Sequence, residues 1–227
     1  MLQENLIRMY EASFRENHDL PALTDYFGKK SVTYFEMAEQ IARLHLLFEK
    51  YGIKQGDKIA LIGRNNVNWC ITYIATITYG AVTVPILQDF NPVDVENIIT
   101  HSESRMLFAG DTFWQTFDSD RMPELEAAMI VNDFSVAYEK EGDALAQIVA
   151  SWDADFKAKY PNGFSIEDIK YPEVPNEQMI LLNYTSGTTS APKGVMLRYE
   201  CVSENVAFGQ KRLPAYPGDT IVSMLPM

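Results

Sequence analysis

A short polar segment between two apolar runs carries the residue types with the clearest chemical potential. It places hydroxyl side chains around a glycine and ends in one cation; these residues are Thr185, Ser186, Gly187, Thr188, Thr189 and Lys193. Gly187 permits a positive φ and a close approach of the backbone to a ligand. Successive backbone N–H groups in such a turn form an anion-binding concavity, hydroxyls add donors, and lysine supplies a point charge for phosphate. The segment therefore predicts a phosphate-binding loop.

This segment does not follow the Walker pattern of phosphate loops. In that pattern a glycine is followed, after four residues, by Gly-Lys-Ser/Thr, and the loop opens a helix. Here Pro192 stands five positions after Gly187, and Lys193 is followed by Gly194 and an apolar run. We therefore expect a loop between two strands. A polar surface hairpin without a ligand is the alternative interpretation.

The chain around the loop alternates short apolar runs with helical patterns. Buried strands are predicted over residues 58–63, 80–86, 106–110, 128–131, 179–182, 195–197 and 220–226. Helices of ten or more residues are expected between the early strands, with signals such as the Thr33–Glu36 capping box and the Asn91-Pro92 start. This alternation indicates an α/β fold, with a mainly parallel sheet covered by helices on both faces.

Composition limits the partners that the chain can take. The formal net charge is −12, and no basic patch is visible, so nucleic acid is not an expected partner. The negative field of the protein repels a triphosphate, so that binding would depend on local donors, Lys193 and Mg²⁺. The two cysteines, Cys70 and Cys201, have neither metal-site spacing nor a disulfide framework. A reduced, cytoplasmic protein is therefore expected.

One uncharged stretch requires a decision about the membrane. Residues 69–87 carry no charge and approach the roughly 20 residues that a helix needs to cross a bilayer. The stretch also contains several threonines, together with Gly80 and Pro85. We therefore interpret it as a buried helix, a glycine stop and a buried strand.

The run from Thr185 to Gly194 resembles the signature of the adenylate-forming superfamily, the AMP-binding enzymes that include acyl-CoA synthetases. The family usually has glycine where this chain has Ser190. Residues 23–36, 51–61 and 68–86 also match the family in order and spacing. The nearest likeness is to long-chain fatty acid–CoA ligases, on Ser190-Ala191 and the following Val195-Met196-Leu197.

The resemblance implies a two-step reaction. A fatty acid carboxylate attacks the α-phosphate of ATP to give acyl-adenylate and pyrophosphate, and the thiol of coenzyme A then displaces AMP. Mg²⁺ accompanies the ATP. By this resemblance the residues from Thr185 to Thr189 and Lys193 would hold the β- and γ-phosphates, and Gly194 would let its strand pass close to them. The motif assigns no catalytic acid, base or nucleophile and no metal ligand to this chain.

Two features limit what the resemblance carries over. Arg198-Tyr199-Glu200 stands where the family usually has Ser/Thr-His. Residues 1–227 resemble only the N-terminal portion of the large AMP-binding domain, without its remainder or the C-terminal domain, so we expect the chain alone to be inactive. Adenylation of an aryl or amino acid, and a non-catalytic nucleotide-binding module, remain alternatives. Peripheral membrane contact of the full-length protein also stays open.

Overall fold

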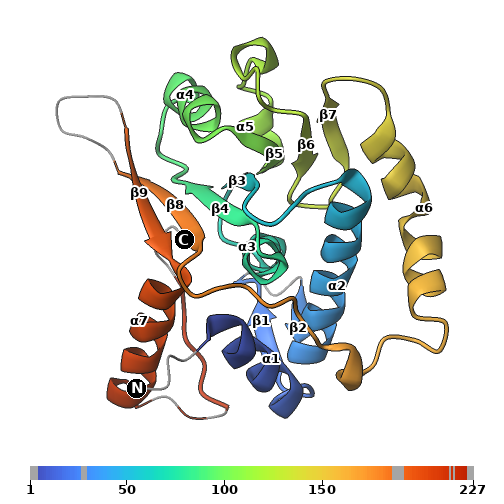
Figure 1. Ribbon diagram of the computed structural model, residues 1–227, viewed down its shortest axis with the longest axis vertical. Coiled ribbons are helices and arrows are strands. Elements are labelled where there is room, and N and C mark those ends of the chain that lie inside the picture. The colour runs from blue at the N-terminus through green and yellow to red at the C-terminus, as the bar shows by residue number, and fades with distance from the viewer. Residues whose placement is uncertain (1–4, 27–29, 186–191, 215, 217, 224–227) are drawn as a thin grey trace.

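A seven-stranded sheet forms the centre of the molecule, with the strand order β7-β6-β5-β3-β4-β8-β9 (Figure 1). The computed structural model describes residues 5–26, 30–185, 192–214, 216 and 218–223. The strands of the sheet are β3 Lys58–Ile62, β4 Val82–Ile86, β5 Ser104–Ala109, β6 Ala127–Ile130, β7 Val136–Glu139, β8 Met179–Thr185 and β9 Lys193–Arg198. All neighbouring pairs are parallel except β6–β7 and β8–β9, which are antiparallel at the two edges. The predicted mainly parallel sheet is confirmed.

Helices lie on both faces of this sheet, as expected (Figure 1). They are α1 Leu6–Glu16, α2 Tyr34–Tyr51, α3 Val67–Tyr79, α4 Pro92–Ser102, α5 Asp111–Trp114, α6 Ala144–Lys159 and α7 Tyr199–Arg212, with 3₁₀ turns at Ser119–Arg121 and Ile166–Asp168. A small separate hairpin joins β1 Pro21–Thr24 to β2 Ser31–Thr33.

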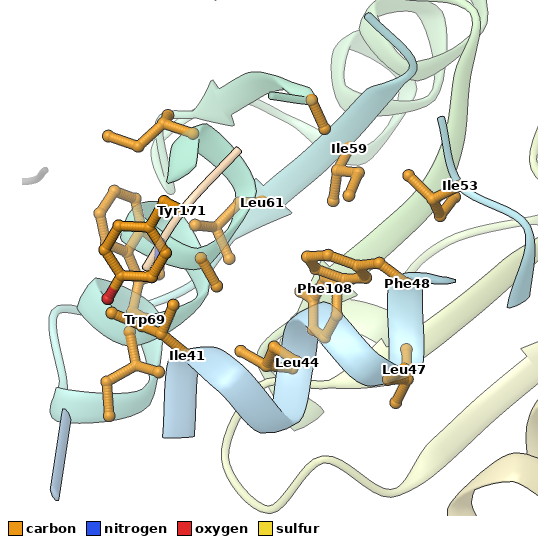
Figure 2. Close-up of a cluster of buried hydrophobic side chains, with 14 of the residues drawn as sticks. Ile41, Leu44, Leu47, Phe48, Ile53, Ile59, Leu61, Trp69, Phe108 and Tyr171 are labelled. Carbon is orange, nitrogen blue, oxygen red and sulfur yellow. The ribbon is translucent and has the colours of Figure 1, made fainter. Parts of the chain in front are cut away.

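The central strand β3 shows why both faces must be covered. Ile59 and Leu61 belong to one buried cluster, whereas the alternating Ala60 and Ile62 belong to the other. Successive side chains of a strand point to opposite faces, so the four apolar residues that follow Lys58 bury side chains on both faces. Figure 2 shows the first cluster, in which side chains from one face of α2 lie beside those of β3 and β5.

Local signals fix several helix ends where the sequence places them. Thr33 and Glu36 form a reciprocal capping box at the start of α2, and Gly52 ends that helix with a φ of 85°. Asn91 caps α4, and Pro92 occupies its first turn. These ends depend on neighbouring residues alone, which is why sequence reasoning finds them.

The uncharged stretch over residues 69–87 divides as interpreted. Most of it lies in α3, which ends at Gly80 with a φ of 90°, and the rest forms β4. Within the part of the chain that the structure describes, no helix combines the length and the hydropathy needed to cross a membrane.

Two strand expectations need correction, and one strand was missed. The run 195–197 is a strand, but Val195 and Met196 are exposed rather than buried, because β9 lies at the edge of the sheet. The strand expected over 220–226 is absent from the described residues 220–223, where Ile221 is 80% exposed and pairs with no strand. The antiparallel edge strand β7 was not expected, since its short run carries no strong apolar pattern.

Thr83 in β4 offers a test of the core. Its side chain is fully buried, and its hydroxyl has no hydrogen-bond partner among the described residues. Burying an unpaired hydroxyl costs about 1–3 kcal/mol, so Thr83→Val should raise the free energy of unfolding by about 1 kcal/mol in urea denaturation. Thr72→Val is the matched control: the buried Thr72 hydroxyl donates to the Asn68 carbonyl at 2.8 Å, and its removal should destabilise. If both variants changed the free energy of unfolding in the same direction, this assignment would be contradicted.

His45 of α2 is held as a neutral imidazole. Its Nε2 lies 2.9 Å from the Ala75 carbonyl oxygen, which can only accept, so Nε2 carries the proton. Burial lowers the pKa of His45 to about 4; the hydrogen bond to Ala75 opposes this shift, and Lys159 adds to it. Nε2 also lies 3.1 Å from the Thr78 hydroxyl, which itself donates to the Ile74 carbonyl oxygen at 2.7 Å. These contacts give the imidazole a structural role between α2 and α3.

The lowered pKa predicts a pH dependence of stability. An unfolded histidine has a pKa of about 6.5, so stability from the neutral imidazole is complete above that pH and is lost as the pH falls towards 4. Between pH 7.5 and 5.0 the loss should be about 2 kcal/mol. Urea denaturation at both values should show this extra loss in the wild type but not in His45→Gln. Parallel pH dependence of the two proteins would rule the assignment out.

Candidate functional site

The predicted phosphate-binding residues lie where β8 turns into β9. The two strands pair antiparallel, and Thr185 and Lys193 are directly opposite each other at the end of the described ladder. The strands expected over residues 179–182 and 195–197 are present but longer than expected, so that Thr185 belongs to β8, and Lys193 and Gly194 belong to β9. Residues 186–191 lie outside the described residues, so the roles assigned to Ser186, Gly187, Thr188 and Thr189 stay predictions. Thr185, Lys193 and Gly194 can be placed.

The pair of Thr185 and Lys193 lies at the carboxyl edge of the parallel strands. β8 runs parallel to β4 through the pair Thr83–Leu181, and β4 runs parallel to β3. Thr185 therefore leaves the sheet at the same edge as the carboxyl ends of β3, β4 and β5. Ligands of open parallel sheets bind outside this edge, so the sheet places the pair where a ligand is expected.

Lys193 is available to an anion. The side chain is exposed, and its ammonium makes no hydrogen bond or ion pair with any residue that the structure describes. The opposite Thr185 is exposed as well. Antiparallel partners have Cβ atoms about 5 Å apart, so one hydroxyl and one ammonium can approach the same phosphate group.

Sequence reasoning missed the side chains beneath this pair. Tyr184 is 2% exposed, and its hydroxyl lies 2.6 Å from Nδ1 of His101 in the last turn of α4. A Cβ added to Gly194 would lie 3.2 Å from Cζ of Tyr184 and 3.0 Å from a methyl carbon of Leu182. A side chain at Gly194 would therefore crowd Leu182 and Tyr184, and these neighbours would have to shift to admit it. The strict alternation of buried residues in β8 could have indicated Tyr184, but nothing local pairs it with His101.

Other groups in the described chain do not form a reactive centre. No cluster of three or more His, Cys, Asp or Glu side chains suited to a metal is found among the described residues. Burial raises the pKa of the Cys70 thiol to about 11, and Asp25 adds to this shift, so the thiol stays protonated at neutral pH.

Comparison with known proteins covers almost the whole chain. The family model described as AMP-binding enzyme matches residues 10–227. Long-chain-fatty-acid–CoA ligase 5 of Rattus norvegicus is 27% identical over 217 residues, which cover 87% of this chain and 30% of the relative. The chain spans about a third of the length of the curated relatives it matches.

Solved structures agree with the fold. The N-terminal domain of FACL13 from Mycobacterium tuberculosis superposes with a TM-score of 0.70 at 20% identity, over 93% of this chain and 48% of that one. The anthranilate CoA ligase AuaEII in complex with anthranoyl-AMP gives a TM-score of 0.67 at 18% identity, over 88% of this chain and 34% of that one.

These matches agree with the sequence signature. The chain belongs to the AMP-binding enzyme family, the adenylate-forming ligases.

Proposed function

We propose that the chain provides the ATP phosphate-binding part of a ligase that activates a fatty acid, first to acyl-adenylate and then to acyl-CoA. The observation that carries the proposal is the β8–β9 hairpin, which sets the exposed Thr185 opposite the exposed Lys193 at the carboxyl edge of the sheet. The similarity to a long-chain fatty acid–CoA ligase supports the choice of acid. Coenzyme A would be the second substrate, and the cytoplasm the proposed location.

The role of the hairpin in this reaction is electrostatic. When the carboxylate attacks the α-phosphate, negative charge moves onto the departing pyrophosphate. The Lys193 ammonium, the Thr185 hydroxyl and the amides of the loop would stabilise that charge. Their effect needs to be local, since the protein carries a net charge of −12 and its overall field opposes a triphosphate. Mg²⁺ bound to the phosphates would neutralise part of their charge.

Binding of MgATP to the chain tests this role. Hydrogen bonds to charged groups contribute about 1.5–3 kcal/mol, so Lys193→Ala should weaken binding at least about 10-fold in isothermal titration calorimetry. Lys193→Arg, which keeps the positive charge, should lose less affinity for MgATP than Lys193→Ala.

The control removes the same charge elsewhere. Lys157 is exposed on α6, which packs on α2 and on β7 at the other edge of the sheet (Figure 1). Lys157→Ala should bind MgATP within about twofold of the wild type, because screening limits the reach of a distant surface charge to about 10 Å. Equal affinities of Lys193→Ala and the wild type would refute the phosphate role.

A second candidate function differs only in the carboxylic acid that is activated. The structural likeness to an anthranilate CoA ligase supports adenylation of an aryl acid as an alternative. ATP–pyrophosphate exchange by the gene product at its natural length, with a panel of fatty, aryl and amino acids, separates the two. We expect exchange to be fastest with a fatty acid. Faster exchange with an aryl or amino acid would replace the fatty acid assignment and keep the adenylation step.

A further inference from the structure

The outer part of the hairpin extends beyond its attachment to the sheet. In the described residues the ladder between β4 and β8 consists of the pair Thr83–Leu181, whereas the β8–β9 ladder continues to Thr185–Lys193. Pro85, two residues further along β4, has no N–H with which to donate to a neighbour. Backbone pairing to β4 therefore does not fix the end of the hairpin that carries Thr185 and Lys193.

A side-chain contact from α4 reaches this end instead. The Tyr184 hydroxyl and Nδ1 of His101 lie 2.6 Å apart, and the two rings meet edge to face with centroids 5.8 Å apart. The ring of Tyr184 is buried, and its pKa is raised by that burial, so the phenol keeps its proton. His101 lies in the last turn of α4, which packs on β5 inside the sheet. The contact thus ties the hairpin to a helix anchored elsewhere.

The same ring also touches the returning strand. Tyr184 and Gly194 are antiparallel partners, and a Cβ at Gly194 would come within 3.2 Å of Cζ and 3.4 Å of Cε1 of the ring. Tyr184 directly precedes Thr185, and Gly194 directly follows Lys193. One ring therefore lies close to both strands, next to Thr185 and Lys193.

We propose that Tyr184, held by His101, is the positioning residue of the phosphate-binding hairpin. Its ring packs close to Gly194, its partner on β9, and its hydrogen bond to α4 fixes where Thr185 and Lys193 meet the phosphates. The ring itself touches no phosphate. This inference rests on the proposed phosphate role of the hairpin and adds two residues, Tyr184 and His101, that the sequence signature does not assign to it.

MgATP titration of four variants tests the proposal. Tyr184→Phe keeps the ring and removes the hydrogen bond, and His101→Leu removes the partner; each should weaken MgATP binding about threefold to tenfold. Because the two substitutions break the same hydrogen bond, the double variant should bind MgATP no more weakly than either single variant. His101→Asn, whose amide can occupy the place of Nδ1, should restore affinity to within about twofold of the wild type.

A matched control separates positioning from loss of stability. Thr72→Val breaks a buried hydrogen bond in α3 and should lower the free energy of unfolding, but it leaves the hairpin untouched. We expect Thr72→Val to bind MgATP like the wild type at a temperature where all variants are folded by circular dichroism. If Thr72→Val weakens binding as much as Tyr184→Phe, the effect is general instability and the positioning role is wrong.

Comparison with Lys193→Ala distinguishes this inference from the proposed function. Loss of affinity in Lys193→Ala together with wild-type affinity in Tyr184→Phe and His101→Leu would overturn the positioning role alone. Wild-type affinity in Lys193→Ala would overturn the phosphate role. Absence of MgATP binding by the wild-type chain would overturn both for this chain.

Discussion

The candidate site depends on one constraint of sheet geometry: β8 runs parallel to β4, and β9 returns antiparallel beside it. The parallel pairing carries Thr185 to the carboxyl edge of the sheet, and the antiparallel return brings Lys193 back opposite it. A hydroxyl and a cation that are separated in sequence thereby become direct neighbours. The hairpin alone does not determine at which end of the strands the two side chains lie. The parallel pairing of β8 with β4 places them at the carboxyl ends.

This arrangement differs physically from a phosphate loop that opens a helix. In such loops the helix N-terminus adds its dipole to the amides that bind phosphate. Here the chain returns as the edge strand β9, and the following helix α7 starts at Tyr199, beyond the far end of that strand. In a protein of net charge −12, the proposed phosphate role would depend on the ammonium of Lys193, the donors of the loop and Mg²⁺ carried by the phosphates. The exposed side chain of Lys193 and its freedom from partners in the described chain suit that task.

Much of the fold could be predicted from the sequence because its signals are local or periodic. The capping box at Thr33, the glycine stops at residues 52 and 80, and the apolar run Ile59–Ile62 of β3 each follow from a few neighbouring residues. The exposure of β9, the edge strand β7 and the absence of pairing over 220–223 could not be predicted in the same way. Whether a segment forms a strand, and whether that strand is buried, depends on the strands that lie beside it. Those neighbouring strands can be far away in the sequence.

In the candidate site, too, local features could be predicted from the sequence and contacts between distant residues could not. The signature from Thr185 to Gly194 indicates the phosphate role and the family, and the family is confirmed over residues 10–227. The contact between His101 and Tyr184 joins residues more than eighty positions apart, and no pattern in the sequence pairs them. Sequence thus identifies the groups that would touch phosphate, whereas only the structure reveals the groups that hold the hairpin in place.

The central claim is that the hairpin holds the phosphates of ATP, and a structure of the chain with Mg²⁺ and a non-hydrolysable ATP analogue tests it most directly. The account predicts Lys193 Nζ at about 3 Å from an oxygen of the β- or γ-phosphate, with the Thr185 hydroxyl beside the same group. A triphosphate bound elsewhere, with Lys193 still facing solvent, would contradict it.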